Sequence, residues 1–443
     1  MKKVLLIGNG GREHCIAKKL SQSKTPVQII NFATAINPGI AEICGTKNIH
    51  VGDILNLKEL RKIAELTKPD WAFLGPDDPI AIGSADVLGT MKIPSFGPTK
   101  KNAQLESSKS FTRNLLQKYN IDASPDFLVS TEVNDGNRAD FFQKRSGNIV
   151  VKADGLLGGK GVIVAGDHFT DFEEAENFAE KSIEKFNRVV LEEKLEGEEF
   201  SLISITDGNV ALHTPAIQDH KRALEDDKGP NTGGMGTISD EKNRLPFLNT
   251  EDIKSAEKIT NQTLQALQKE TGERYIGCMY GGFIKTKNGI RLIEYNARFG
   301  DPEVYNVLPI MKNDLVEVCE KAIAGNLAEV GELKFKSVAT VVRYLCPKGY
   351  PENPIRDEQI FYTENEASKG EFFYASVGID EGRMLLKGSR AVAISGVGKN
   401  IAEAKARGDE LIKSFSGPLF YRSDIGTPEL MQKRIDHLKA LGI

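Results

Sequence analysis

The sequence has little of what marks secreted, membrane-spanning or nucleic-acid-binding proteins. Its five cysteines are an odd number, widely spaced and without a C-x-x-C pair, which argues against a disulfide framework or a zinc site. No apolar run is long enough to span a membrane and no signal peptide is recognisable, so we expect a cytoplasmic protein. A net charge of -4 indicates no general affinity for nucleic acid, so any anion site must be local.

The remaining composition is that of an ordinary globular protein, with 40% hydrophobic and 27% charged residues. A chain of 443 residues is too long for one hydrophobic core and predicts several domains. Strands that alternate with helices at the start predict a parallel sheet with ligands at its carboxyl edge. We predict an N-terminal α/β domain at 1–121, a small α+β unit at 122–194, a central α+β domain at 195–330 and a C-terminal α+β domain at 331–443. Within these domains we expect a helix from about Lys101 to Tyr119, a helix with a capping box that starts at Thr170, and a strand from Phe372 to Val377.

The most informative stretch runs from Ile149 to Val164 and consists of a β-branched strand, a glycine-rich turn and a second strand. A hairpin with glycine at its tip can lay backbone N–H groups against an anion, because no side chain keeps the anion away. Lys152 and Lys160 would add positive charge. The stretch is not a G-x-x-x-x-G-K-[ST] loop, since Asp154 and Gly161 stand where Gly and Ser or Thr are required. By itself it is equally well a flexible hairpin with solvated lysines.

A second anion site is predicted where the strand Lys3 to Gly8 leads through Asn9 to His14 into a helix. This turn imitates the dinucleotide fingerprint G-x-G-x-x-G, but Glu13 replaces the third glycine. The next strand, Val27 to Phe32, offers no acidic residue for a ribose diol. We therefore favour the phosphate of a smaller ligand over NAD.

A predicted hairpin joins the strands Gly281–Lys287 and Ile290–Asn296 through Asn288-Gly289. Glu294 and Asn296 are two residues apart, so their side chains leave the same face of the strand. Carboxylate and amide oxygens suit Mg²⁺, although such a pair is most often a solvated strand edge. Here the strand runs directly into a polar, glycine-bearing segment, which favours a metal site.

Two connecting segments are also unusual. The acidic stretch from Glu192 to Glu199 joins two strands and, taken alone, is a solvated charged loop. The segment from Gln218 to Gly236 is too long and too rich in glycine for a simple connection, and loops of that kind are usually functional or disordered.

Read together, these motifs resemble the phosphoribosylamine–glycine ligase family (glycinamide ribonucleotide synthetases) of ATP-grasp enzymes. The matching segments follow the family's order: Gly8–His14, Lys152–Gly155, Gln218–Arg222, Gly229–Gly236 and Arg298–Glu303. The resemblance implies a multi-domain α/β ATP-grasp fold in which the unit at 122–194 is a lid over ATP. It implies ATP-dependent ligation of glycine to 5-phosphoribosylamine through glycyl phosphate, in purine biosynthesis. It further implies Mg²⁺ or Mn²⁺, no nucleic-acid or membrane partner, and a monomer or weak homodimer.

The resemblance also assigns residues to each ligand. The ATP-binding residues would be Lys109, Lys152, Gly158, Gly159 and Lys160 at the phosphates, Glu192 and Leu195 at the adenine edge, and Glu199 at the ribose. The metal ligands would be Glu294 and Asn296, and the catalytic residues Arg298 and Lys152. The substrate-binding residues would be Gly10, Gly11 and Arg12 at the sugar phosphate, Arg298 at the glycine carboxylate, Asp219 at its ammonium group, and Lys221, Gly300 and Asp301.

Some positions depart from the family pattern. Tyr305 stands where a polar residue, often Gln, is usual, so a polar contact there is open. Lys387 to Arg390 replaces a more usual double glycine before the arginine, which weakens the expectation for the C-terminal domain. Leu157-Gly158 stands where small residues are typical, which a lid should tolerate.

Three alternatives remain: a different ATP-grasp carboxylate–amine ligase, a nucleotide-binding regulatory protein without turnover, and a nicotinamide-dependent oxidoreductase. The intact segments Gly229–Gly236 and Arg298–Glu303 argue against the first. The retained lysines and metal pair argue against the second. The third rests only on the Gly8–Gly11 turn.

Overall fold

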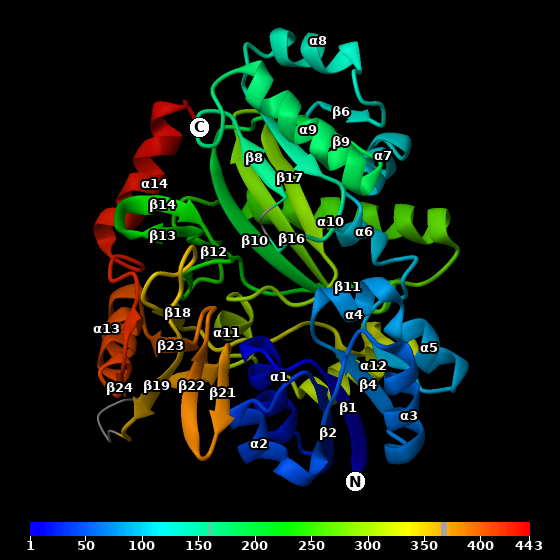
Figure 1. Ribbon diagram of the computed structural model, residues 1–443, viewed down its shortest axis with the longest axis vertical. Helices are drawn as coiled ribbons and strands as arrows, with labels where there is room; N and C mark the ends of the chain where they lie inside the picture. Colours follow the sequence, from blue (N-terminus) through cyan, green and yellow to red (C-terminus); the bar gives the residue numbers. More distant parts are fainter. Residues whose placement is uncertain (159–160, 365–369) are drawn as a thin grey trace.

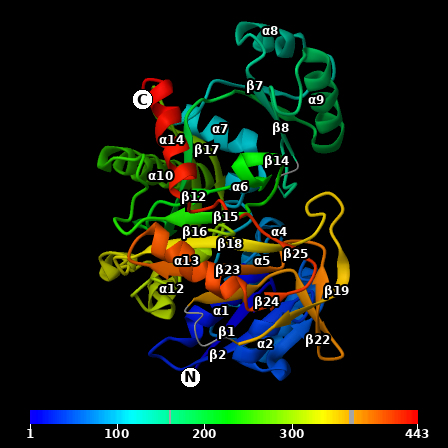
Figure 2. The same ribbon diagram turned by 90° about the vertical axis from the view of Figure 1, so that its left-hand side faces the viewer.

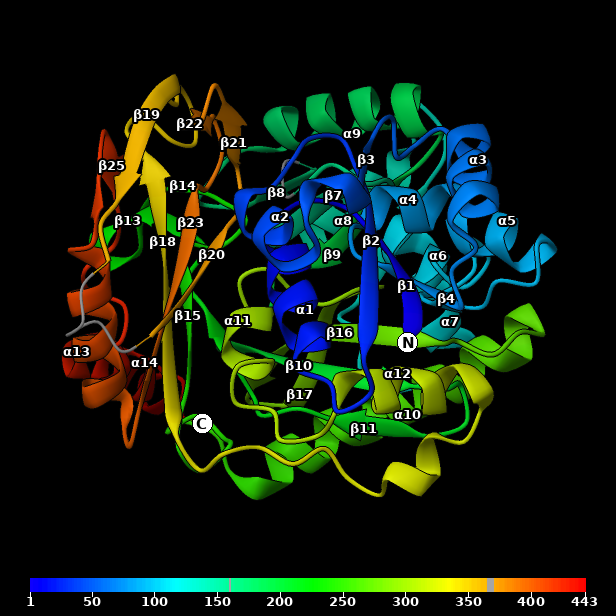
Figure 3. The ribbon, with the colours of Figure 1, turned by 90° about the horizontal axis from the view of Figure 1, so that it is seen from below.

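The computed structural model describes residues 1–158, 161–364 and 370–443. Gly159 and Lys160, both predicted phosphate ligands, lie outside the described residues. Figures 1 and 2 show the N-terminal sheet at one end of the molecule and the lid at the other, and Figures 1 and 3 show the C-terminal sheets along one side. Among the helices of the described residues, none is both long and apolar enough to cross a membrane.

The N-terminal region is a five-stranded sheet with the order β3-β2-β1-β4-β5, and every neighbouring pair is parallel. The predicted parallel sheet is therefore confirmed. Residues Val4 to Ile7 are fully buried, as expected for a central parallel strand covered on both faces. The strands are β1 (Lys2–Ile7), β2 (Val27–Ala33), β3 (Ile49–Val51), β4 (Trp71–Leu74) and β5 (Ser95–Phe96). The helices are α1 (Gly11–Ser21), α2 (Pro38–Cys44), α3 (Leu57–Thr67), α4 (Asp77–Ile82) and α5 (Ser84–Thr90), with the 3₁₀ turn η1 (Thr46–Asn48).

The predicted helix from Lys101 to Tyr119 is wrong, because the chain breaks at Ser108 into two helices. Ser108 is extended, and its hydroxyl accepts a hydrogen bond from the N–H of Phe111 at 3.2 Å. The helices are α6 (Gln104–Ser107) and α7 (Lys109–Lys118). The break places Lys109 at a helix start.

The lid contains the antiparallel sheet β6-β9-β7-β8 and two helices over one face (Figure 2). Its buried residues, among them Val151 and Ile183, form a hydrophobic cluster separate from the main core. Asp171 caps the longer helix through Glu174, one residue later than the predicted capping box at Thr170. The elements are β6 (Phe127–Ser130), α8 (Gly136–Lys144), β7 (Ile149–Ala153), β8 (Val162–Val164), α9 (Phe172–Phe186) and β9 (Val189–Glu193).

The central region is the antiparallel sheet β11-β10-β16-β17, with the long helix α10 packed against it. The predicted hairpin at Asn288-Gly289 is confirmed as β16 and β17. The elements are β10 (Glu198–Thr206), β11 (Ala211–His213), α10 (Thr250–Thr271), β16 (Gly277–Thr286), β17 (Gly289–Asn296), α11 (Val304–Val307), α12 (Leu315–Ala324) and η3 (Leu327–Val330).

The C-terminal region extends the central one, because the sheet β12-β15-β18-β23-β20 takes its first two strands from the glycine-rich segment at 218–239. The predicted strand Phe372–Val377 is in fact two strands, β20 and β21, which belong to different sheets. The long segment's strands are β12 (Gln218–Asp219), β13 (Arg222–Leu224), β14 (Lys228–Asn231) and β15 (Gly236–Ser239), with η2 (Glu225–Asp227). The later strands are β18 (Ala339–Pro347), β19 (Arg356–Tyr362), β20 (Glu371–Tyr374), β21 (Val377–Asp380), β22 (Arg383–Lys387), β23 (Val392–Gly398), β24 (Phe415–Ser416) and β25 (Leu419–Phe420), and the helices are α13 (Ile401–Ile412) and α14 (Pro428–Ala440).

Candidate active site

The turn predicted to bind a phosphate, Gly10-Gly11-Arg12, begins α1 and is fastened by two charged side chains. Glu13, which stands where a fingerprint would have glycine, accepts the Gly10 N–H at 2.6 Å. Its other oxygen accepts Arg12 Nε at 2.9 Å, while Arg12 also donates to the carbonyl of Phe299 at 3.1 Å. The turn is thus tied to the segment that follows β17, and one of its N–H groups is already engaged by a carboxylate.

Arg298 lies in that following segment, between two carboxylates of the N-terminal region. Its guanidinium is 3.3 Å from Glu106 and 4.0 Å from Asp77. Its buried Nε has no hydrogen-bond partner among the described residues. An arginine held in place with a free donor is suited to receive a carboxylate.

Glu106 and Asp77 were not predicted as site residues, and their pKa values move in opposite directions. Burial raises the pKa of Glu106 to about 7, and the charge of Arg298 limits the rise. Burial would also raise the pKa of Asp77, but Arg298 and Arg12 outweigh it and lower that pKa. The N–H of Ala297 donates to Glu106 at 2.8 Å, so this carboxylate also fixes the backbone before Arg298.

Lys152, at the start of the lid turn, is held in a buried ion-pair triad. Glu192 accepts from Arg113 through both oxygens, at 2.7 and 2.8 Å, and its Oε2 is 2.8 Å from Lys152 Nζ. Burial alone would raise the pKa of Glu192, but Arg113 and Lys152 lower it to about 2. Burial, helped by Arg113, lowers the pKa of Lys152 despite the pairing. The side chain of Glu192 therefore positions Lys152, and both of its oxygens are engaged rather than open to an adenine.

Lys109 joins the body of the molecule to the lid. Its ammonium donates to the carbonyl of Gly155 in the lid turn at 2.9 Å. Asp154 in the same turn accepts from the Ser108 hydroxyl and the Ser110 N–H, each at 3.1 Å. The start of α7 and the lid turn thus form one unit. Gly158, with a φ of +54°, lies in the same turn.

The predicted ribose acceptor, Glu199 at the start of β10, is paired with Lys221 at 2.9 Å. The charge of Glu199 is the main cause that raises the pKa of Lys221. Burial raises the pKa of Asp219 well above its ordinary value, the charge of Glu303 adds to this, and Asp219 Oδ1 has no partner among the described residues. Leu195 is half-buried in the connector between β9 and β10.

The predicted metal ligands, Glu294 and Asn296, lie at the end of β17 and are half-buried. Burial would raise the pKa of Glu294, but Lys221, Lys152 and Lys109 outweigh it and lower that pKa. An ionised carboxylate beside an amide oxygen, facing several lysines, fits a divalent cation that arrives with a polyphosphate. The described residues contain no group of three or more His, Cys, Asp or Glu side chains arranged to hold a metal ion.

The C-terminal region contributes Arg390, which was not predicted as a site residue. Its guanidinium donates to the carbonyls of Gly233 at 2.6 Å, Gly234 at 2.8 Å and Asp301 at 3.2 Å. It is also 3.5 Å from the carboxylate of Asp301. A Cβ at Gly300 would crowd the carboxylate of Glu303 and the ring of Tyr280, so these side chains would have to shift to admit it. The segment at 298–303 is therefore held by the N-terminal region through Arg12 and Glu106 and by the C-terminal region through Arg390.

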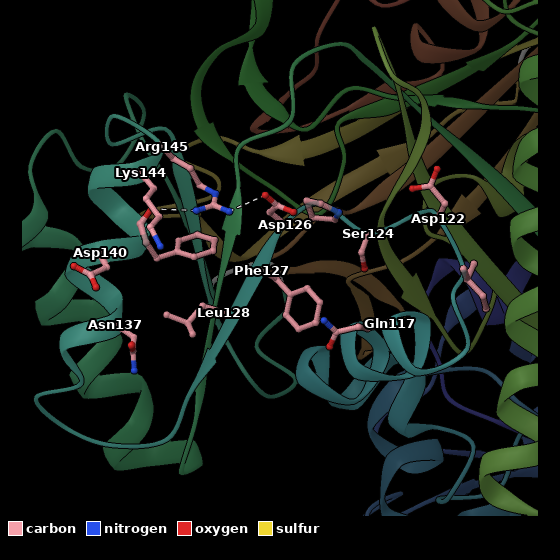
Figure 4. A pocket seen from close by; sticks show the side chains of 13 residues that line it. Gln117, Asp122, Ser124, Asp126, Phe127, Leu128, Asn137, Asp140, Lys144 and Arg145 are labelled. Carbon is pink, nitrogen blue, oxygen red and sulfur yellow. Dashed lines mark hydrogen bonds and ion pairs between the residues drawn. The ribbon is translucent and has the colours of Figure 1, made fainter.

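A cavity of about 540 Å³ lies elsewhere, where the lid meets α7 (Figure 4). Arg145 lies beside it and pairs with Asp126 at 2.8 Å. The residues that line it are Gln117, Ile121, Asp122, Ser124, Pro125, Asp126, Phe127, Leu128, Asn137, Asp140, Phe141, Lys144 and Arg145. Since none of these is a predicted site residue, we do not place the chemistry in this cavity.

Comparison with known proteins matches three successive parts of the chain to family models. These models describe phosphoribosylglycinamide synthetase: its N domain at 2–106, its ATP-grasp (A) domain at 107–304 and its C domain at 340–428. Two relatives are named phosphoribosylamine–glycine ligase. The one from Methanosarcina barkeri is 42% identical over 444 residues and 99% of each chain, and the one from Methanococcus vannielii is 40% identical over 447 residues, 99% of this chain and 100% of the relative. A crystal structure with the same name, from Thermotoga maritima, has a TM-score of 0.79 and 26% identity over 96% of this chain and 100% of the other.

Proposed function

Because the chain belongs to the phosphoribosylglycinamide synthetase family of ATP-grasp proteins, we propose that it ligates glycine to 5-phosphoribosylamine. The reaction consumes ATP and yields glycinamide ribonucleotide, ADP and phosphate, in purine biosynthesis. The observation that carries the proposal is the position of Arg298. This arginine, suited to a carboxylate, donates to the same Phe299 carbonyl as Arg12, and its charge acts on Glu294 together with the charges of the lysines.

The proposed chemistry begins with activation of glycine. A carboxylate is a poor electrophile, and its phosphorylation creates an acyl phosphate that an amine can attack. Phosphoryl transfer depends mainly on positioning and on neutralised charge. Lys109 and Lys152 would hold the phosphates from either side of the lid turn, and Glu294 and Asn296 would hold Mg²⁺ or Mn²⁺. The metal ion would neutralise charge on the phosphates when bound.

The substrates would meet at the loop that follows β17. Arg298 would grip the glycine carboxylate, and the unpaired Oδ1 of Asp219 would accept from the glycine ammonium. The sugar phosphate would lie at the N-terminal turn, with Asp301 facing the sugar. Gly158, Gly159 and Lys160 would cover the phosphates from the lid.

We infer the remaining assignments in the same way. Adenosine would lie at the connector between β9 and β10, with Leu195 at the adenine and Glu199 at the ribose once Lys221 turns toward the phosphates. The functional domains would be 1–121, 122–194, 195–330 and 331–443. The enzyme would act as a monomer or weak homodimer in the cytoplasm.

The test is an ADP-release assay, coupled to product analysis by mass spectrometry, in which each substrate is omitted in turn. We expect one glycinamide ribonucleotide per ADP with the full mixture, and no ligated product when glycine, phosphoribosylamine or Mg²⁺ is absent. A reaction mixture without the enzyme is the control for ADP that forms without catalysis. ADP release that depends on a different carboxylate or amine, with no glycinamide ribonucleotide, would indicate another ATP-grasp ligase.

A further inference from the structure

The most informative departure from the family pattern is Tyr305, on the short helix α11. Its side chain is fully buried, and its ring stacks on Phe373 at a centroid distance of 5.1 Å. A buried tyrosine hydroxyl needs a hydrogen-bond partner. Here the partner is the hydroxyl of Tyr344 on β18, at 2.8 Å, and Tyr344 is also fully buried.

The two hydroxyls form a chain with a fixed direction. Tyr344 donates its one hydrogen to Oδ1 of Asp301 at 2.6 Å. A hydroxyl has a single hydrogen to donate, so Tyr305 must be the donor in the bond between the two tyrosines. Burial raises the pKa of both tyrosines well above the ordinary value, so both hydrogens stay in place at physiological pH. The chain therefore ends at the carboxylate of Asp301.

Arg390 holds the same carboxylate from the other direction. Its guanidinium is 3.5 Å from Asp301 Oδ1 and stacks over the ring of Tyr344 at 4.5 Å. No hydrogen bond to Asp301 Oδ2 occurs within the described part of the chain. One oxygen of Asp301 is thus fixed by the C-terminal region, and the other can accept a hydrogen bond from a ligand.

The other end of the chain lies against the turn proposed to bind the sugar phosphate. A Cβ added to Gly11 would collide with the hydroxyl of Tyr305 and would lie 3.0 Å from the Cβ of Ala375. The Tyr305 hydroxyl therefore touches the backbone of the phosphate turn. The Tyr305 hydroxyl is hydrogen-bonded to Tyr344, which is hydrogen-bonded to Asp301. The Gly10-Gly11-Arg12 turn and Asp301 therefore lie at opposite ends of one buried hydrogen-bond chain.

We propose that Tyr344, supported by Tyr305, is a positioning residue that fixes the Asp301 carboxylate at a set distance from the Gly11 turn, for recognition of 5-phosphoribosylamine. This inference rests on the proposed function. Asp301 Oδ2 would accept from the hydroxyl or amine hydrogens of the sugar, whose phosphate binds at the turn. The tyrosines do not touch the reacting atoms. Their effect should fall on the sugar amine alone.

The test is steady-state kinetics of Tyr344→Phe, which removes one oxygen and keeps the ring beneath Arg390. We expect KM for phosphoribosylamine to rise about tenfold, the loss typical of a hydrogen bond to a charged group. KM for ATP and for glycine should stay within about twofold of wild type, because neither substrate depends on Asp301. Tyr305→Phe, which loses only the outer hydroxyl, should show the same selectivity with a rise of about threefold. Tyr362→Phe is the matched control, because the Tyr362 ring lies away from the site and packs on Phe372, with the two ring centroids 4.7 Å apart.

A double-mutant cycle separates positioning from simple structural support. In an Asp301→Ala background, which has no acceptor for the Tyr344 hydroxyl, Tyr344→Phe should raise KM for phosphoribosylamine no further, because Tyr344 acts through the carboxylate. An equal loss for all three substrates, or a full penalty that persists without the carboxylate, overturns the inference. If Tyr344→Phe fails to fold, Tyr305→Phe is measured in its place, and an unchanged KM for phosphoribosylamine in that variant overturns the inference. If the wild-type chain forms no glycinamide ribonucleotide, the proposed function itself is overturned. If the wild type ligates normally but the variants affect all three substrates equally, only the role of the tyrosines is overturned.

Discussion

Replacement of Glu192 by glutamine should destabilise the protein more than almost any other single change of a charged residue. Glu192 is about 3% exposed and accepts from Arg113 and Lys152 with its two oxygens. Glutamine keeps one oxygen and turns an NH₂ group toward the two cations. The variant therefore leaves two buried positive charges without their counter-ion.

The pKa of Glu192 gives the size of the effect. Its folded value of about 2 lies below the ordinary 4.5. At 1.36 kcal/mol per pKa unit, this gives the carboxylate a stabilising contribution of about 3 kcal/mol above pH 4.5. Removal of one partner from a buried ion pair typically costs about 3–5 kcal/mol, so the two figures agree.

The assay is urea unfolding at pH 7 and at lower pH. Because the folded pKa is lowered, the wild type keeps the full contribution above pH 4.5 and loses it as the pH falls toward 2. Glu192→Gln should lose about 3–5 kcal/mol at pH 7 and lack this part of the pH dependence. Glu193→Gln, at the exposed neighbouring position, is the control and should change stability by less than about 0.5 kcal/mol. A loss below about 1 kcal/mol in Glu192→Gln, with an unaltered pH profile, would mean that the ion pairs of Glu192 do not stabilise the fold.

Three further predictions concern the site. Arg298→Lys should raise KM for glycine about ten- to a hundredfold and leave KM for ATP near wild type, because an ammonium group cannot replace the two parallel hydrogen bonds of a guanidinium to a carboxylate. A rise in KM for phosphoribosylamine alone would assign Arg298 to that substrate instead. Lys152→Ala should weaken nucleotide binding, as measured by calorimetry. Glu294→Ala should instead lower kcat by about a hundredfold or more, because a bound metal ion would neutralise charge that develops during phosphoryl transfer. Near-normal turnover of Glu294→Ala at ordinary Mg²⁺ would contradict the metal assignment. Gly11→Ala should raise KM for phosphoribosylamine, because the added Cβ would collide with the Tyr305 hydroxyl, and adding Tyr305→Phe to this variant should partly lower that KM again. If the second change does not lower KM, the collision is not the cause.

Local patterns predicted the parts of the fold that local chemistry determines. The Asn288-Gly289 turn fixed the hairpin β16–β17, and the buried apolar run at 4–7 fixed a central parallel strand. The two helices divided at Ser108 were predicted as one, because the helical periodicity continues through a residue that tertiary contacts hold extended. Ser108 donates to Asp154 in the lid, and no local pattern signals that partner.

The same division applies to the site. Arg298 was assigned from its motif, and the structure places its guanidinium beside Glu106 and Asp77, while its role toward glycine stays a prediction. Glu106, Arg113 and Arg390 could not be predicted, since each acts through a partner that is 79 to 192 positions away in the sequence. Arg113 lies within an ordinary helix pattern, and only the folded chain brings it to Glu192. Long-range ion pairs leave no periodic trace in a single sequence.

Ligation through glycyl phosphate can be tested by mass spectrometry of the products formed from ATP, phosphoribosylamine and glycine labelled with ¹⁸O in both carboxylate oxygens. Arg298 contacts the carboxylates of Glu106 and Asp77 and the carbonyl of Phe299, and in the proposed path it holds a glycine that is activated as glycyl phosphate. That path transfers one labelled oxygen to phosphate and leaves the other in glycinamide ribonucleotide. We predict singly labelled phosphate and singly labelled glycinamide ribonucleotide in equal amounts. Unlabelled phosphate beside the ligated product would exclude glycyl phosphate as the intermediate, and labelled phosphate with no ligated product would exclude the ligation itself.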